Sequence, residues 1–167
     1  MSEPNLSRYR SNVHGSARYV AQQIVMKPYF WSALNVHIHG RSHLESLDNP
    51  LVVIANHSSH LDAPLIFGAL PRRITRHLSA GAAADHFFQK KVKGAATSLF
   101  FNAFPVDRKG MKGKKNRGIA GALLSDGQSL LIFPEGTRTT PGQPMQLQRG
   151  AANIAVRCQA DLRLAHI

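Results

Sequence analysis

The strongest structural signal in the chain lies in the stretch Leu51-Val52-Val53-Ile54-Ala55-Asn56-His57-Ser58-Ser59-His60-Leu61-Asp62. Its first five residues are apolar and mostly β-branched, and Pro50 precedes them, so they predict a buried β-strand. Pro64 and an apolar segment follow Asp62 and predict a helix that begins near this carboxylate. His57 therefore lies between a strand end and a helix start, where open α/β sheets bind their ligands.

The spacing of His57 and Asp62 is long enough for the chain to turn back and bring the carboxylate to the imidazole. A carboxylate on one ring nitrogen fixes the tautomer and leaves the other nitrogen to accept a proton. A purely structural interpretation is also open. In it, Asn56 and His57 satisfy backbone groups at the strand end, and Asp62 is the N-cap of the helix.

The composition is that of one globular domain with an anionic partner. The chain has 167 residues, of which 43% are hydrophobic, and its net charge is +12. Nucleic acid, an anionic membrane and a phosphorylated substrate all fit this charge. A single cysteine, Cys158, excludes an intramolecular disulfide, and its helical context predicts a core position. Residues 1–5 lack the apolar core of a signal peptide, and no run of 18 apolar residues predicts a transmembrane helix.

Residues 1–33 predict a polar tail followed by an amphipathic helix, which Pro28 should kink or break. Val20, Ile24 and Trp31 are expected on one apolar stripe. Because this segment is basic and contains the aromatic residues Tyr29, Phe30 and Trp31, it is suited to a membrane interface. A helix that covers a sheet fits the same pattern equally well. Residues 34–40 alternate apolar and polar side chains and predict a half-buried strand.

Strands and helices alternate along the rest of the chain. Further strands are predicted at 74–80, at 129–133 and from 162 onward, and helices at 62–70, 82–91, 117–125 and 151–159. This alternation predicts an α/β fold, a mostly parallel central sheet flanked by helices. Residues 34–167 are expected to form this domain after the N-terminal segment 1–33.

Four stretches carry a family resemblance. His57 to Asp62 resembles the first motif of the glycerolipid acyltransferases, and Phe133-Pro134-Glu135-Gly136-Thr137-Arg138 resembles the third motif residue for residue. Residues 102–108 are similar to the second motif, although Asn102 stands where many members carry Gly and Pro105 where many carry Phe. Gln148-Arg149-Gly150 resembles the basic residue and Gly that often follow the third motif. The fourth motif of the family should begin near Leu162, but the usual Pro is absent from residues 162–167. We therefore expect a domain that is incomplete at its C-terminal end.

The resemblance implies transfer of a fatty acyl group from acyl-CoA or acyl carrier protein to lysophosphatidate. His57 is then the general base and Asp62 orients it. The implied substrate-binding residues are Arg108, Glu135, Gly136, Thr137 and Arg138, with Asn56 and Arg149 as supporting residues. The two arginines suit a phosphate, and Glu135 could hold them in place or accept a hydrogen bond from a glycerol hydroxyl. No metal or other cofactor is implied. The expected location is peripheral, on the cytoplasmic face of the cell membrane.

Other classes remain open from the sequence. His57, His60 and Asp62 are three possible ligands for a metal hydrolase. The basic window 108–117 fits a nucleic-acid-binding module, although no binding motif accompanies it, so we expect no nucleic-acid partner. The acceptor could be another lysophospholipid or a glycolipid, and an intact but inactive fold is also compatible. Ser58 is a possible nucleophile by residue type. However, neighbouring side chains in an extended chain point to opposite sides, so Ser58 is not expected to face the imidazole of His57.

Overall fold

The computed structural model describes residues 5–44, 47, 50–83, 99–106, 114–136 and 147–167. In this part of the chain five parallel strands form one sheet in the order β3-β2-β4-β1-β5. The strands are β1 (Leu51–Ala55), β2 (Leu78–Ala83), β3 (Phe104–Val106), β4 (Ser129–Ile132) and β5 (Asp161–Ala165). The predicted parallel α/β fold is confirmed. Because the strands are parallel, the loops after β1 and β4 leave the same edge of the sheet.

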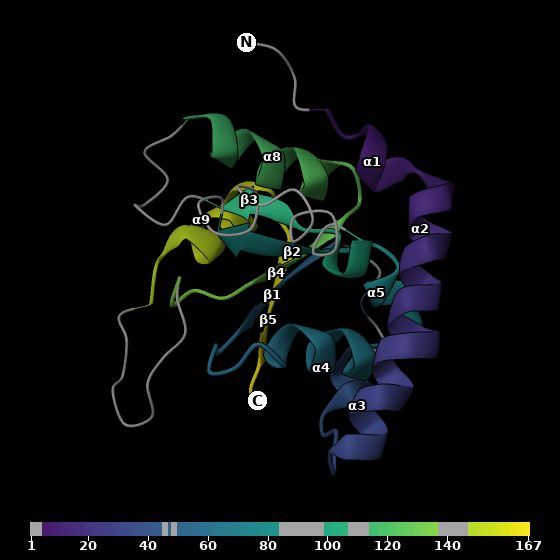
Figure 1. Ribbon diagram of the computed structural model, residues 1–167. Coiled ribbons are helices and arrows are strands. Elements are labelled where there is room, and N and C mark those ends of the chain that lie inside the picture. Colours follow the sequence, from purple (N-terminus) through teal and green to yellow (C-terminus); the bar gives the residue numbers. More distant parts are fainter. Residues whose placement is uncertain (1–4, 45–46, 48–49, 84–98, 107–113, 137–146) are drawn as a thin grey trace.

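Helices cover both faces of the sheet (Figure 1). On one face Val52 and Leu130 pack beneath α8 (Lys114–Ser125) and α9 (Gly150–Arg157). On the other face Val53 and Leu131 pack with α4 (Asp62–Ala69) and α5 (Arg72–Thr75). The apolar run of β1 is therefore buried on both sides, as is usual for a central parallel strand.

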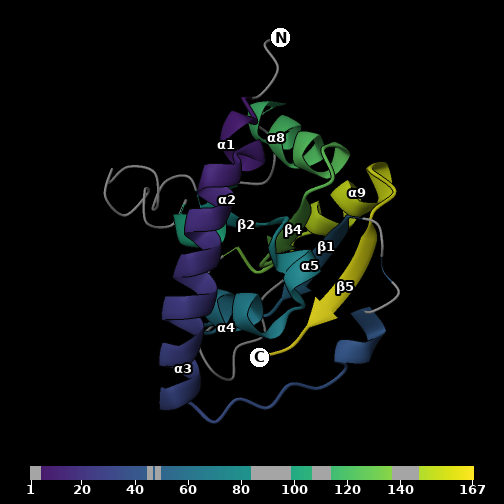
Figure 2. The same cartoon turned by 90° about the vertical axis from the view of Figure 1, so that its right-hand side faces the viewer.

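A long helical rod runs along the outside of the domain (Figure 2). After the short α1 (Ser7–Arg10), it consists of α2 (Asn12–Tyr19), the π-helix η1 (Val20–Met26) and α3 (Lys27–Ala33). The predicted break at Pro28 is wrong. The π-helical segment just before Pro28 widens the turn where the ring would clash with a carbonyl of a regular α-helix.

The rod does not bury the predicted apolar stripe. Val20 and Ile24 are 48% and 62% exposed, whereas Arg18 and Gln22 are buried. The π-helix changes the helical period, so Val20 and Ile24 do not share the buried side with Trp31. Trp31 packs on α4, where a Cβ added to Gly68 would lie 2.6 Å from its ring. Burial, followed by the charge of Arg8, lowers the pKa of Arg18.

Two contacts attach α1 to the rest of the domain, one to the turn after α8 and one to the residue before β3. Arg10 forms an ion pair with Asp126, 2.6 Å apart, and this hydrogen-bonded contact lowers the pKa of the Asp126 carboxyl. Tyr9 donates a hydrogen bond from its hydroxyl to the Ala103 carbonyl, and burial raises the pKa of this phenol. The rod is thereby attached at its N-terminal end and, through Trp31, along α4.

Two predicted strands differ in the structure. Residues 34–40 form no strand and are largely exposed. The place beside β1 is taken by β5, and residues 34–40 do not join either outer strand of the sheet. The strand predicted at 74–80 begins only at Leu78. Pro71 starts a helical turn there, accepting hydrogen bonds from the amides of Ile74 and Thr75. The helix predicted at 82–91 lies almost entirely outside the described residues.

The described part of the chain contains no helix that is both long enough and apolar enough to cross a bilayer.

Candidate active site

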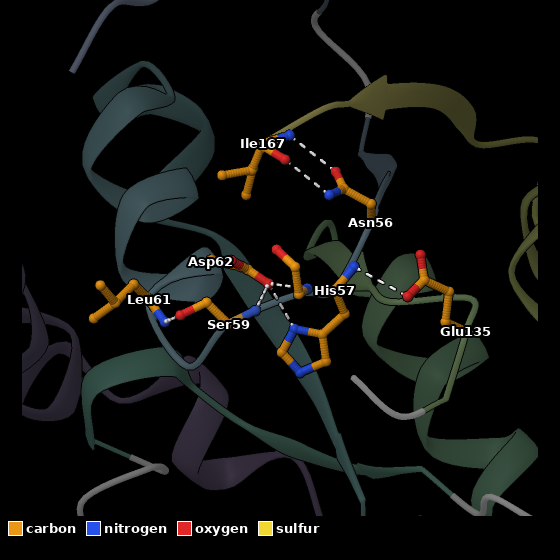
Figure 3. Close-up of polar contacts among 8 residues, drawn as sticks. Asn56, His57, Ser59, Leu61, Asp62, Glu135 and Ile167 are labelled. Atoms are coloured by element: carbon orange, nitrogen blue, oxygen red, sulfur yellow. Dashed lines mark hydrogen bonds and ion pairs between the residues drawn. The ribbon is translucent and has the colours of Figure 1, made fainter. Parts of the chain in front are cut away.

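One carboxylate oxygen organises the loop between β1 and α4 (Figure 3). Asp62 Oδ2 accepts hydrogen bonds from the backbone amides of Ser58, at 2.8 Å, and Ser59, at 2.9 Å. His57 Nδ1 lies 2.8 Å from the same oxygen. Asp62 is only 1% exposed, so these donors, and not bulk water, provide its hydrogen bonds.

This geometry assigns the tautomer of His57. Backbone amides only donate, so Asp62 Oδ2 acts as an acceptor and Nδ1 carries the proton that it donates. The basic nitrogen is then Nε2. The His57 side chain is 23% exposed, so the ring is held by buried groups but remains reachable from outside. A general base needs this combination of a fixed ring and access to the reacting proton.

Asp62 is not the N-cap that the structural interpretation required. Leu61 occupies the N-cap position of α4, and Asp62 is the first helical residue. Ser59 Oγ accepts a hydrogen bond from the Leu61 amide at 3.1 Å, so this serine belongs to the turn. Ser58 is exposed, and its amide is one of the donors to Asp62.

The loop after β4 forms the second wall of the site. Ile54 of β1 pairs with Ile132 of β4, so the segments that follow these strands are neighbours. The ring of Phe133 stacks on His57, with ring centroids 4.2 Å apart and planes at 24°. Glu135 Oε2 accepts a hydrogen bond from the His57 amide at 3.3 Å.

The third-motif turn is closed on itself. Gly136 has φ = +70° and donates its amide to the Phe133 carbonyl at 3.1 Å. The Gln148 amide donates to the Pro134 carbonyl, and a Cβ on Gly136 would lie 2.8 Å from Gln148 Nε2. The positive φ favours glycine here, and any larger residue would also have to displace the Gln148 side chain.

The two supporting residues take structural positions. The Asn56 side chain donates to the Ile167 carbonyl at 2.8 Å and accepts from the Ile167 amide at 2.9 Å, joining the end of β1 to the second residue after β5 (Figure 3). Arg149 is exposed at the N-cap of α9. Arg108, Thr137 and Arg138 lie outside the described residues.

Asn102, which replaces a frequent Gly of the second motif, has a backbone reason for its identity. Its φ is +48°, and asparagine tolerates this left-handed region better than most residues. The residue is fully buried, and its Nδ2 donates to Ser79 Oγ at 2.8 Å. Asn102 thus retains the backbone conformation that a glycine would provide.

A metal site is not formed by the described residues. Among them, no three His, Cys, Asp or Glu side chains come together as a potential ligand set. His57 and Asp62 bind each other, and His60 is exposed.

Phe133 and Gln148 make contacts at the site that the motif resemblance did not predict. Phe133 was the first residue of the third motif, and this was the only signal available. Its contact with His57 depends on the order of β1 and β4 in the sheet, which the sequence pattern does not contain.

The fold and the site define an α/β protein with a histidine–aspartate pair at the carboxyl edge of a parallel sheet. Residues 35–163 match the family model described as Acyltransferase. The chain therefore belongs to the acyltransferase family.

Two relatives resemble this chain over about two thirds of its length. The chain is 36% identical over 116 residues to a 1-acyl-sn-glycerol-3-phosphate acyltransferase of Bacillus subtilis, covering 69% of this chain and 54% of the relative. It is 32% identical over 129 residues to "Taffazin" of Dictyostelium discoideum, covering 67% and 40%.

A solved structure shares the fold. It is that of the 1-acyl-sn-glycerophosphate (LPA) acyltransferase PlsC from Thermotoga maritima, with a TM-score of 0.64 and 21% identity. The match covers 95% of this chain and 62% of the other. The chain thus spans between 40% and 62% of the length of these three proteins.

Proposed function

We propose that the protein transfers a fatty acyl group from a thioester, acyl-CoA or acyl carrier protein, to the free hydroxyl of lysophosphatidate, giving phosphatidate. The observation that carries the proposal is the His57–Asp62 pair, with Nε2 as the basic nitrogen at the carboxyl edge of the sheet. The names of the Bacillus and Thermotoga relatives support this choice of acceptor.

The reaction needs one base and no covalent intermediate. His57 Nε2 takes the proton of the acceptor hydroxyl while the oxygen attacks the thioester carbonyl. Collapse of the tetrahedral intermediate breaks the C–S bond, and the imidazolium returns its proton to the departing thiolate. Between these steps the buried charge of Asp62 stabilises the imidazolium. A serine nucleophile is unnecessary because a thiolate leaves readily.

The acceptor phosphate is assigned to Arg108 and Arg138 on the strength of the motif resemblance. Thr137 and the turn at Gly136 complete this proposed substrate-binding segment. Glu135 has a second role beside any contact with substrate, because its carboxylate holds the His57 amide. Substrate binding and the position of the base would then share one loop.

Direct assay tests the proposal. Purified protein mixed with lysophosphatidate and acyl-CoA, or acyl carrier protein, should form phosphatidate, measured by mass spectrometry. Other lysophospholipids and a lysoglycolipid serve as comparison acceptors. Absence of phosphatidate with both donors, in anionic vesicles as well as detergent, would contradict the assigned function.

We further propose that the rod binds the surface of an anionic membrane on the cytoplasmic face. Its exposed apolar residues include Val13, Val20, Ile24, Val25 and Tyr29, from 48% to 78% exposed. These five side chains are exposed along the rod, whereas Arg18 and Gln22 are buried. The net charge of +12 favours anionic headgroups.

The double variant Val20→Ser/Ile24→Ser should lower partitioning onto phosphatidylglycerol vesicles about tenfold, because it removes two apolar side chains from the interface. Val156→Ser is the matched control, since Val156 is 79% exposed on α9. Sedimentation with vesicles measures the effect. Equal loss in both variants would rule out the rod as the membrane contact. Tighter binding to DNA than to vesicles at matched salt would contradict an anionic membrane as the partner.

A further inference from the structure

The ring of Phe133 is the group in face-to-face contact with the imidazole of His57. The centroids are 4.2 Å apart and the planes differ by 24°. We propose that Phe133 is a positioning residue that holds the His57 ring in the plane in which Nε2 can reach the acceptor hydroxyl. The inference rests on the proposed acyl transfer, but the geometry behind it can be tested without that reaction.

The hydrogen bond to Asp62 orients the ring through one atom, Nδ1. Rotation about the bond from Cβ to the ring has broad minima in histidine, so a contact on the ring face restricts the imidazole further. The face of Phe133 restricts this rotation, and Glu135 holds the backbone amide of the same residue. Three parts of His57 thus have separate partners: Nδ1 contacts Asp62, the ring face contacts Phe133, and the backbone amide contacts Glu135. Small misplacements of a reacting group lower rates strongly, so this orientation matters for catalysis.

The stack also suits the charge that appears during the reaction. When Nε2 takes a proton, the ring becomes an imidazolium whose positive charge lies over the phenyl face. Cations are attracted to the face of an aromatic ring within about 6 Å of its centroid. A leucine at the same position would fill similar space but would offer neither a planar surface nor this attraction.

The chain provides a matched control for the loss of packing. Phe101 and Phe133 are both partly buried and pack against the same core cluster. Phe101 lies tilted against Phe67, with centroids 5.6 Å apart and planes at 59°. Phe101→Leu therefore removes a comparable ring from the same cluster without removing the stack on His57.

Kinetics on the intact protein separate positioning from packing. Phe133→Leu should lower kcat roughly threefold to tenfold with KM unchanged, and Phe133→Tyr, which keeps the stack, should restore kcat. Phe101→Leu should lower the unfolding midpoint to a similar degree but leave kcat as in the wild type. Equal kcat in Phe133→Leu and Phe101→Leu would overturn the inference.

A spectroscopic test is independent of activity. Histidine can be labelled with carbon-13, and the His57 ring resonance identified by its loss in His57→Ala. Phe133→Leu should move this resonance downfield because the shielding phenyl face is removed, whereas Phe101→Leu should not. An unchanged resonance overturns the inference even if the chain proves inactive. If His57→Ala keeps its activity, the proposed mechanism fails while the shift still decides the geometry.

Discussion

His57→Ala is expected to lower the rate of phosphatidate formation by a factor on the order of 10²–10⁴, the usual contribution of a positioned general base. The substitution removes the only group to which we assign proton transfer. The Ser58 and Ser59 amides still donate to Asp62, so the loop retains most of its hydrogen bonds. We therefore expect a fall in kcat with little change in KM or in the unfolding midpoint.

His60→Ala is the matched control for this prediction. His60 lies in the same loop and is exposed, so its removal should leave kcat unchanged. Steady-state kinetics of both variants with lysophosphatidate as acceptor provide the measurement. A His57→Ala protein that works within a few-fold of the wild type would exclude the imidazole as the base.

Asp62→Asn is the second large effect. The amide keeps the shape of the side chain but removes its charge and replaces one acceptor oxygen by an NH2 donor, so the three donors face a weaker, neutral acceptor. We expect kcat to fall on the order of 10³–10⁴-fold, because the imidazolium loses its counter-charge. The free energy of unfolding should also fall by about 1–3 kcal/mol, since bonds to a charged acceptor become bonds to a neutral one.

The double variant His57→Ala/Asp62→Asn separates the two roles of Asp62. If Asp62 acts on the reaction through His57, adding Asp62→Asn to His57→Ala should cause little further loss of activity. The loss of unfolding free energy, measured in urea, should persist in the double variant because two amide donors remain. A full second loss of activity would show that Asp62 acts on the substrate independently of the imidazole.

Local patterns predicted the centre of the fold well. The apolar run 51–55, the helix at Asp62 and the strand after Gly127 all follow from composition and turn residues, and the structure contains them. The meeting of His57 with Asp62 was predictable because both lie in one short loop. The alternation in 34–40 was misleading, since a strand forms only where it pairs with another strand, and a local pattern does not show whether it does.

Contacts across the sheet were not predictable from the pattern. Phe133 and Glu135 reach His57 only because β4 lies beside β1, and this order is set by packing. The change of period in η1, which leaves Ile24 exposed, lies where the rod contacts α4, and the sequence pattern did not indicate it. Glu135 was predicted as a substrate contact; its bond to the His57 amide adds a positional role that motif resemblance did not indicate.

The position of helix α4 between the rod and His57 affects how far from the membrane the reaction takes place. It begins with the carboxylate that orients the imidazole, and Gly68 near its other end accommodates Trp31 of the rod. If the rod lies on the membrane as proposed, this helix of eight residues connects the rod to the loop that holds His57 and helps to set the height of Nε2 above the lipid headgroups. A lysolipid would then need to rise only part of the way out of its leaflet to reach the base, leaving its hydrocarbon tail in the bilayer.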